Sequence, residues 1–418
     1  MRLPRSSYRM LVTSALSLTL LVSLPPISGE AGSWSTPTGW KLGKGLRLQR
    51  WDDPATPRRI FVLRIDPDVE AGAVSVDTAM PGAALPGDAR TSEIAARAGA
   101  FAAINGDFGT SRPDHPFAAD GELWQNGPQK GFSFALSQDE KTTYFGDPRP
   151  RVTVAGPTGT FVVDDWNAGA PSGDEIAGYT PRGGSVEDPP EDACSVKLDP
   201  VAGSGLSWAP DRNAVVRSYK VVGAPVCQHS AVSENGMTVL SVKSSASSSA
   251  KEPLTGLQVN DTVSFKWSSG WPGVTDSIGG RPLIVQGGHA IPITCSSGNP
   301  LCQANPRTAV AVDAKGIIMF VVADGRSAGW SSSITLSAFQ DFLVSKLGAV
   351  DALNMDGGGS STMWVQKTGP WCFSQSKSAT GCIVNHANPG ANYVERSVEN
   401  ALVVYKGRDP GEPVISGP

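Results

Sequence analysis

The sequence predicts an α+β fold, in which helices pack on a mixed, mostly antiparallel β-sheet core. The first reason is composition, because 47 glycines and 33 prolines among 418 residues indicate many turns. The second is that short apolar runs of strand type recur between turn residues, while long helical patterns are few. The length permits either two domains or one large domain with insertions.

The first residues have the pattern of an export signal. Three arginines among the first nine residues precede an apolar run from Met10 to Leu24, and small residues near 28–32 offer a cleavage site. The run is short and rich in Ser and Thr, which disfavours a lasting membrane span; an uncleaved anchor is the alternative. We therefore expect residues 1–29 to be a secretory signal peptide and the mature protein to be secreted and extracellular, without a stable membrane span.

Strands and one short helix are expected in the first part of the mature chain. Ile60–Ile65 and Ala73–Ala79 are apolar runs of strand type. Residues Thr91–Ala98 predict a helix, because a threonine can cap its start and Gly99 can end it. The apolar run Ala100–Ile104 follows as a further strand.

The rest of the chain predicts mainly strands and loops. Residues 150–275 alternate short apolar runs with turn residues, and the Ser-rich stretch at 244–249 predicts an exposed loop. Ala309–Val312 and Ile317–Ala323 flank a short turn and predict a hairpin. Four apolar residues on one face predict a helix that ends at Gly348; they are Leu336, Phe339, Leu343 and Leu347. The other predicted strands are Val350–Met355, Ser361–Gln366 and Ala401–Tyr405.

The six cysteines fall into three neighbouring pairs along the chain. Six cysteines permit 15 pairings, but local pairing is the simplest, and export favours disulfides. A metal cluster is the rival interpretation, and the lack of C-x-x-C and of ligand-spaced histidines disfavours it. The predicted disulfides are Cys194–Cys227, Cys295–Cys302 and Cys372–Cys382.

Three strand-like segments end in polar turns that contain glycine and a carboxylate; these turns begin at Asn105, Asp324 and Asp356. Ligand sites often lie beyond strand ends, although Asp-Gly is also an ordinary turn signal. Three successive glycines, Gly357–Gly359, exceed what a turn requires, because each one costs folding entropy. Such a loop suits close approach of the backbone to a ligand, and its N–H groups can form an anion-binding nest.

Arginines near these turns can complete a phosphate site. Arg307, Arg326 and Arg396 each carry a guanidinium that can grip phosphate oxygens bidentately, although each could instead be a surface residue paired with a carboxylate. Ser360 and Ser361 follow the glycines without forming G-x-S-x-G, which disfavours a Ser/His/Asp hydrolase. Neither G-x-G-x-x-G nor a Walker loop occurs, and the net charge of −4 gives no sign of a nucleic-acid partner.

Six segments, in this order, resemble the phosphodiester glycosidase family. The likeness runs from about residue 60 to 406, and the blocks that start at Arg307 and at Leu353 are its most specific part. The segments are Asn105-Gly106-Asp107-Phe108, Gly279–Val285, Arg307-Thr308-Ala309-Val310, Asp324-Gly325-Arg326-Ser327, Leu353–Thr362 and Glu395–Leu402. Where the family usually reads Asn-Gly-Gly-Phe-Phe, this chain has Asp107, which suggests local tuning toward its substrate.

The resemblance implies a phosphodiester glycosidase-like catalytic domain at 60–408, preceded by a lead-in at 30–59 and followed by a flexible tail at 409–418. It also implies a hydrolase that cleaves the sugar–phosphate linkage of glycosidic phosphodiesters, such as those of N-acetylglucosamine. Two other functions remain open: a cell-wall polysaccharide glycosidase or transglycosidase, and a non-catalytic carbohydrate-binding protein. In each case the partner is a carbohydrate or a sugar phosphodiester, including a cell-envelope glycan.

The roles of individual residues follow from this resemblance and from the chemistry of the turns. We expect Asp356 to act as base or nucleophile, with Asp324 or Glu395 as the second carboxylate. Phosphate is a good leaving group, so a strong general acid is needed less than in ordinary glycoside hydrolysis. No cofactor is expected, and a structural Ca²⁺ is left open. The arginines and glycine amides are expected to hold phosphate, and Asn105 and Asp107 to bind sugar hydroxyls. The full set of expected substrate-binding residues is Asn105, Asp107, Arg307, Arg326, Gly357, Gly358, Gly359, Ser360 and Arg396.

Overall fold

The computed structural model describes residues 32–418 except for short internal and terminal gaps. The gaps are 128–130, 184–191, 228–236, 295–297, 374–376, 379–380, 411–414 and 417–418. The predicted signal peptide at 1–29 lies outside the described residues. Within the described part of the chain, no helix has the length and apolar character that a membrane span needs.

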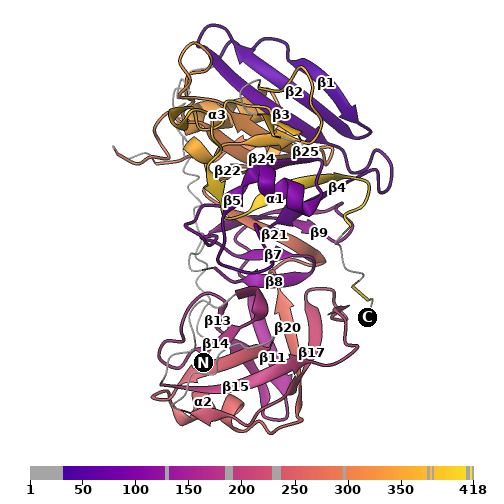
Figure 1. The fold of residues 1–418 in the computed structure, drawn as a ribbon, viewed down its shortest axis with the longest axis vertical. Helices are drawn as coiled ribbons and strands as arrows, with labels where there is room; N and C mark the ends of the chain where they lie inside the picture. Colours follow the sequence, from indigo (N-terminus) through magenta and orange to yellow (C-terminus); the bar gives the residue numbers. More distant parts are fainter. Residues whose placement is uncertain are drawn as a thin grey trace, which may run out of the picture.

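The protein is mainly β, so the predicted α+β balance is wrong, while the mostly antiparallel character of the sheets is confirmed (Figure 1). Of the strand pairs in the described residues, one is parallel, between β13 (Asp165–Trp166) and β14 (Ile176–Tyr179). The α-helices in the same residues are α1 (Thr91–Ala98), α2 (Ser248–Thr255) and α3 (Leu336–Ser345). Helices are few because the short apolar runs between turns pair with each other as strands. The sheets that they form bury their apolar side chains by packing against other layers.

An eight-stranded sheet carries the predicted hairpin at its centre. Strand β24 pairs with β25 so that Arg307 lies opposite Ala323, as the hairpin prediction requires. Helix α3 packs on one face of this sheet through Phe339, Phe342 and Leu343, and Thr335 caps it by accepting the Ala338 N–H at 3.2 Å. In spatial order the strands are β1 (Thr38–Gly43), β2 (Leu46–Asp53), β3 (Arg58–Ile65), β25 (Ile318–Ala323), β24 (Arg307–Asp313), β26 (Ala349–Asn354), β22 (Leu283–Gln286) and β23 (His289–Ala290).

Two smaller sheets cover the other face of the eight-stranded sheet. Their shared core joins residues such as Leu63 and Phe320 to Ile104, Leu402 and Phe134. Helix α1 packs on the outer side of the six-stranded sheet. That sheet is ordered β28 (Lys377–Ser378), β29 (Gly381–Ile383), β27 (Met363–Val365), β6 (Ala102–Asn105), β31 (Ala401–Lys406) and β4 (Val74–Ala79). The five-stranded sheet is ordered β10 (Thr143–Gly146), β9 (Phe132–Ser137), β21 (Val274–Gly280), β7 (Phe117–Ala119) and β8 (Glu122–Gln125), and a small pair joins β30 (Ser397–Val398) to β5 (Ala89–Arg90).

A ten-stranded sheet lies at the far end of the molecule from α3 (Figure 1), and its hydrophobic cluster also includes Ala118 and Leu123 of the five-stranded sheet. The chain enters it after β10 and leaves it before β21. Ile415, in the segment predicted as a tail, is buried in the same cluster. The strands not yet named are β12 (Gly159–Val163), β11 (Arg151–Gly156), β20 (Thr262–Ser268), β17 (Val215–Val221), β15 (Ala193–Pro200), β19 (Thr238–Lys243), β16 (Ser207–Trp208) and β18 (Val226–Cys227).

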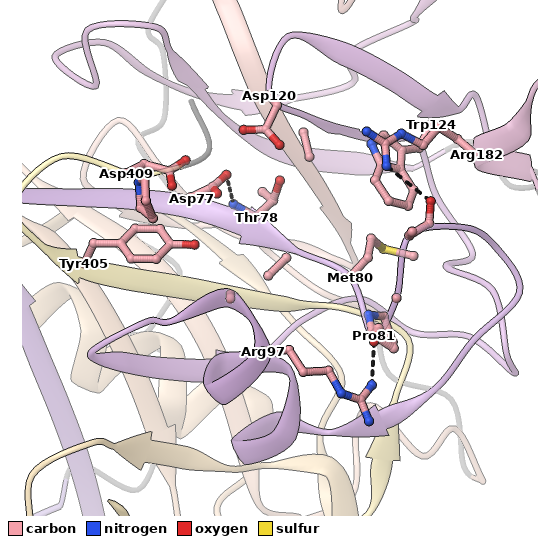
Figure 2. A pocket seen from close by; sticks show the side chains of 16 residues that line it. Asp77, Thr78, Met80, Pro81, Arg97, Asp120, Trp124, Arg182, Tyr405 and Asp409 are labelled. Carbon is pink, nitrogen blue, oxygen red and sulfur yellow. Dashed lines mark hydrogen bonds between the residues drawn. The ribbon is translucent and has the colours of Figure 1, made fainter. Parts of the chain in front are cut away.

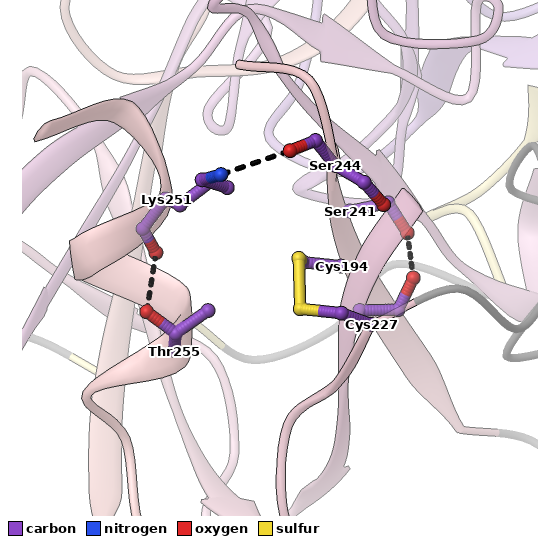
Figure 3. The surroundings of a disulfide bond; sticks show 7 residues. Cys194, Cys227, Ser241, Ser244, Lys251 and Thr255 are labelled. Atoms are coloured by element: carbon purple, nitrogen blue, oxygen red, sulfur yellow. Dashed lines mark hydrogen bonds between the residues drawn. A yellow bond between two sulfur atoms is a disulfide. The ribbon is translucent and has the colours of Figure 1, made fainter. Parts of the chain in front are cut away.

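Two of the predicted disulfides are confirmed. Cys194–Cys227 links β15 to β18 at directly opposed positions, as Figure 3 shows, and Cys372–Cys382 ties Cys372 to strand β29. The third predicted pair includes Cys295, which lies outside the described residues. The Ser-rich stretch at 244–249 was predicted as a loop, but its last residues form the start of helix α2. Ser247 caps this helix by accepting the Ala250 N–H at 3.2 Å.

Candidate functional site

The turn after β26 is held in place by strands from two sheets. The Asp356 N–H donates to the Gly106 carbonyl at 3.0 Å, and the Asn105 side-chain amide donates to the Asp356 carbonyl at 2.7 Å. From the other side, the Gly358 N–H donates to the Pro306 carbonyl at 2.9 Å. Strand ends that are far apart in sequence thus fix the position of the Asp356 carboxylate.

Glycine is required at 357 and 358 by two different constraints. A Cβ on Gly357 would lie 2.9 Å from the Pro306 carbonyl oxygen, and Gly358 has a left-handed φ of 64°. The Gly357 and Gly358 N–H groups donate within the protein, to Asp356 Oδ1 at 2.8 Å and to Pro306. These two amides are therefore not available to a phosphate, and the part of the anion-nest hypothesis that rests on them is wrong.

A cavity of about 390 Å³ opens beside this turn. Of the residues predicted from the sequence, the structure brings Asp356, Gly357–Gly359, Arg307, Arg326 and Arg396 into its wall. The other residues that line it are Phe108, Arg281, Asn299, Pro300, Leu301, Asn305 and Asn354. Its size falls within the range of small-ligand sites.

The cavity is rich in guanidinium groups with few acidic partners. Arg307 is 3% exposed and donates to the carbonyls of Leu301 at 2.7 Å and Gln303 at 2.5 Å. Arg326 donates to the Asn305 side-chain oxygen at 2.5 Å. Among the described residues, no carboxylate forms an ion pair within 4.0 Å with Arg307, Arg326 or Arg396. Burial, and secondly the charge of Arg326, lower the pKa of Arg307 to about 10.

Asp356 is the carboxylate in the wall of this cavity. Burial raises its pKa, and the nearby Asp107 adds to the effect. The Ser360 hydroxyl, the charge of Arg396 and the Gly357 N–H act in the opposite direction, since they favour the charged form. Ser360 itself is buried beside Asp356 and does not line the cavity. A half-buried carboxylate with a raised pKa has the properties of a general base.

The two carboxylates predicted as partners of Asp356 lie elsewhere, so this part of the prediction is not supported. Asp324 is 2% exposed and accepts hydrogen bonds from Trp330 Nε1 at 2.7 Å, Asn385 Nδ2 at 3.1 Å and the His386 N–H at 3.0 Å. Burial raises the pKa of Asp324 to about 6. Glu395 accepts both the N–H of Ser92, at 3.0 Å, and its hydroxyl. Both carboxylates therefore accept hydrogen bonds from protein groups outside the cavity.

Asn105 and Asp107, which were expected to bind sugar hydroxyls, are fully buried and also lie outside the cavity wall. Asn105 accepts the Thr308 hydroxyl at 2.9 Å in addition to its bond to the turn. Asp107 Oδ1 lies 2.7 Å from His115 Nδ1. Asn105 thus supports the turn from behind and joins segments that are distant in sequence, whereas the Asp107 side chain bonds to groups close to it in sequence.

Arg281 and Asn305, which line the cavity, and Glu399, which is close enough to Asp356 to be affected by its charge, were not singled out from the sequence. Arg281 lines the cavity and pairs with Asp114 at 3.1 Å. Glu399 is 7% exposed, and its pKa rises to about 7 through burial and through its proximity to Asp356 and Asp107. Arg281 and Glu399 both lie in the segments that resemble the family, which is the signal that could have found them.

A second, larger cavity of about 530 Å³ contains none of the predicted site residues (Figure 2). Asp77, Asp120 and Asp409 line it, and their carboxylate oxygens lie within 4.8 Å of one another. Acidic groups at such distances are common in proteins without an ion, so this cluster by itself defines no metal site.

The antiparallel scaffold and the arginine-lined cavity define a β-rich protein with a cavity whose wall carries several positive charges. Residues 213–405 match the model of the phosphodiester glycosidase family. This match confirms the resemblance seen in the motifs that lie within these residues. No curated protein matches the sequence.

Two solved structures with low sequence identity share the fold. A hypothetical protein from Synechocystis superposes with a TM-score of 0.62 at 19% identity, covering 88% of this chain and 64% of its own. This chain therefore spans less than two thirds of that protein. A putative exported protein from Burkholderia pseudomallei K96243 has a TM-score of 0.54 at 18% identity, with 84% and 74% covered. The zebrafish N-acetylglucosamine-1-phosphodiester alpha-N-acetylglucosaminidase catalytic domain, auto-inhibited by its pro-peptide, has a TM-score of 0.41 at 14% identity, with 91% and 85% covered.

Proposed function

We propose that this protein is a secreted hydrolase that cleaves the bond between a sugar and the phosphate of a glycosidic phosphodiester. One observation carries the proposal: Asp356 shares a cavity with four arginines, three of which form no ion pair with a carboxylate in the described residues. The family of the domain points to the same chemistry. An ordinary glycosidase acting on neutral glycans has no need of such a cluster of positive charge.

The proposed reaction uses Asp356 and the arginines in different roles. Asp356 takes a proton from water, and the water oxygen bonds to the anomeric carbon. The bond between that carbon and the phosphate oxygen breaks, and its electron pair stays on the phosphate. Arg307, Arg326 and Arg396 stabilise the charge that develops on the leaving phosphate, because charged donors arranged in advance favour the transition state. We expect the sugar whose anomeric carbon is attacked to be N-acetylglucosamine.

The predicted signal peptide supports secretion, and so do the two described disulfides, because disulfides form in oxidising compartments. Expression of the full chain, with analysis of the medium and of the mature N-terminus, tests this part. A protein retained inside the cell with reduced cysteines would contradict it.

A substrate panel on purified protein tests the activity. We expect turnover of an N-acetylglucosamine 1-phosphodiester and little turnover of the matching neutral aryl glycoside. Equal cleavage of the two compounds would favour a cell-wall glycosidase. Binding of the phosphodiester without any turnover would favour a non-catalytic carbohydrate-binding protein.

A further inference from the structure

A further cavity, of about 300 Å³, is lined mainly by aromatic side chains and shares no lining residue with the arginine-lined cavity. Its tryptophans come from three distant parts of the chain: Trp40 from β1, Trp330 from the turn after β25, and Trp371 from the segment before β29. Phe373 and His386 also line it. The proposed reaction makes no use of these residues, and we call this cavity the aromatic pocket.

A disulfide holds two of the aromatic residues in place. Trp371 and Phe373 flank Cys372, which is bonded to Cys382 in β29. Trp371 lies against Trp40 with the ring centroids 6.1 Å apart and an interplanar angle of 60°, so neither ring covers the face of the other. Both tryptophans are half-buried. Because the backbone of Trp371 is fixed in advance, binding of a ligand to these rings costs little entropy of ordering.

The wall of the aromatic pocket also contains a buried polar atom without a partner. The ring of His386 is packed between Trp330, with centroids 4.0 Å apart, and Phe373, with centroids 3.7 Å apart. Its Nδ1 lies 3.0 Å from the Ser327 hydroxyl, whereas its Nε2 has no hydrogen-bond partner among the described residues. An unsatisfied buried polar atom is unfavourable. A ligand hydroxyl can satisfy Nε2 in either tautomer of the ring, because a hydroxyl both donates and accepts.

The charges around the aromatic pocket are matched, which favours an uncharged ligand. Arg50 lines the pocket and pairs with Asp52 at 3.0 Å. Arg59 lies over the ring of Trp330 at 3.6 Å and pairs with the same carboxylate at 2.9 Å. No carboxylate is among the described residues that line the pocket. A cation would lie near two guanidinium groups, and an anion would find both of them already paired. A pyranose ring, with apolar C–H faces and hydroxyl groups at its edge, matches aromatic rings and a neutral hydrogen-bonding atom.

Short segments connect the aromatic pocket to the arginine-lined cavity. Arg326 lines the cavity, and Trp330, four positions later, lines the pocket, which places their Cα atoms at most roughly 14 Å apart. On a second segment, His386 is two positions from Asn388, whose side-chain oxygen would lie 2.9 Å from a Cβ on Gly359 in the cavity wall. One glycan chain of a few sugar units can therefore reach both places.

We propose that the aromatic pocket is a second carbohydrate-binding site, which holds an uncharged sugar unit in the alcohol part of the substrate, beyond the phosphate. An apolar face of the sugar packs on Trp371 or Trp40, and a hydroxyl bonds to His386 Nε2. Arg326, which the proposed reaction assigns to the phosphate, lies on the segment that leads to Trp330, and this favours the alcohol side. Binding of the sugar is independent of the proposed function, whereas its effect on turnover rests on that function.

Calorimetric titration with two neutral trisaccharides, one of glucose and one of N-acetylglucosamine, tests the binding. We expect the wild type to bind at least one of them, and Trp371→Ala to weaken that affinity by about tenfold, because a ring contact and the apolar area that it buries are lost. Trp271→Ala is the matched control, because Trp271 is also half-buried, stacks on a single aromatic ring, Tyr144 at 5.5 Å, and does not line the pocket. Its affinity should equal that of the wild type. Absence of binding to either trisaccharide, or equal affinities for the wild type and a folded Trp371→Ala variant, overturns the inference.

A second variant and a second ligand complete the binding test. Trp40→Ala changes a different element and leaves the disulfide-bonded segment intact, so it decides the question if Trp371→Ala does not fold. It should also weaken the affinity for the trisaccharide, and an unchanged affinity in a folded Trp40→Ala variant overturns the inference. Titration with 1-octanol tests an apolar chain as the ligand. Tighter binding of 1-octanol than of either trisaccharide, lost in these variants, overturns the assignment to carbohydrate.

Turnover tests the place of the bound sugar in the substrate. Two N-acetylglucosamine 1-phosphodiesters are compared, one of methanol and one of a neutral disaccharide. We expect a higher kcat/KM for the disaccharide compound in the wild type, and a ratio near one in Trp371→Ala, with the methanol compound cleaved as by the wild type. A ratio unchanged in Trp371→Ala overturns the assignment to the alcohol side. If neither compound is turned over, the hydrolase proposal fails, and the titrations still decide whether the aromatic pocket binds carbohydrate.

Discussion

Asp356 and Asp324 both follow an apolar strand and precede a glycine, yet their surroundings assign them different tasks. Asp324 is saturated by three donors from Trp330, Asn385 and His386. Asp356 is half-buried, lines the cavity and has an arginine nearby. A carboxylate with all its acceptors used stabilises the fold, whereas one that faces a cavity can exchange a proton.

Asp356→Asn should lower kcat by roughly 10²–10⁴-fold, because an amide of the same shape cannot act as a base. The melting temperature and ligand affinity should stay close to those of the wild type. Asp324→Asn is the matched control, and it should lose stability, since its amide group places a donor against three donors of the protein. If a stable Asp356→Asn variant keeps more than about a tenth of the rate, the catalytic carboxylate is elsewhere, and Glu399 becomes the next candidate.

Inorganic phosphate should inhibit the enzyme, and Arg326→Lys should weaken that inhibition by about tenfold. The ammonium group of lysine cannot reproduce the planar fork with which a guanidinium binds two phosphate oxygens. Inhibition constants for wild type and variant, measured at the same ionic strength, provide the comparison. Identical constants would mean that Arg326 does not contact the anion.

At the scale of elements, the site depends on strand ends that belong to different sheets. Asn105 closes β6 and joins it both to Thr308 in β24 and to the turn after β26. Helix α2 and the ten-stranded sheet pack around a separate hydrophobic cluster. Changes in that cluster should therefore affect stability more than turnover.

Removal of the Cys194–Cys227 disulfide tests this separation. The double variant Cys194→Ala/Cys227→Ala should lose roughly 2–4 kcal/mol of unfolding free energy, because the bond restricts the unfolded chain between two residues 33 apart. We expect kcat/KM at a temperature well below unfolding to stay unchanged. Denaturant unfolding and steady-state kinetics on one preparation measure both quantities. A large loss of rate in a folded variant would show that the ten-stranded sheet shapes the site.

At the scale of the whole molecule, buried carboxylates connect the site to the pH dependence of stability. Burial, with Asp356 nearby, raises the pKa of Glu399 from 4.5 to about 7. The folded state then binds the proton of Glu399 more tightly than the unfolded state does. The contribution of Glu399 to stability is present below pH 4.5 and is lost as the pH rises toward 7. Asp324, with a raised pKa of about 6, acts in the same direction.

His386 has the opposite effect, because burial lowers its pKa from 6.5 to about 4. The contribution of His386 is present above pH 6.5 and is lost as the pH falls toward 4.

The raised pKa of Glu399 predicts that the unfolding free energy contributed by this residue decreases as the pH rises from 5 to 7. Glu399→Gln should make this decrease smaller, which denaturant titrations at several pH values can measure. A slope in this range identical to that of the wild type would mean that Glu399 does not hold a proton in the folded protein.

Local sequence patterns determined much of this protein: the hairpin of β24 and β25, helix α1, the local cysteine pairs and the glycine turn at Asp356. Each depends on neighbours in the chain, through turn chemistry, capping or strand alternation. The position of Arg307, Arg326 and Arg396 near the polar turns was also visible in the sequence, and the cavity brings these residues together.

Only the tertiary structure decided which of the candidate side chains face the ligand. Asp324 is bound by residues 61 and 62 positions away, and Glu395 by Ser92, 303 positions away. Asn105 is likewise held inward by Thr308, 203 positions away, and the Gly358 amide by Pro306, whereas Asp107 and the Gly357 amide bond to partners close in sequence. A polar side chain can bind a ligand only if its hydrogen-bonding groups are not already bonded to another segment of the protein. Which segments come close enough to form those bonds is determined when the sheets pack together.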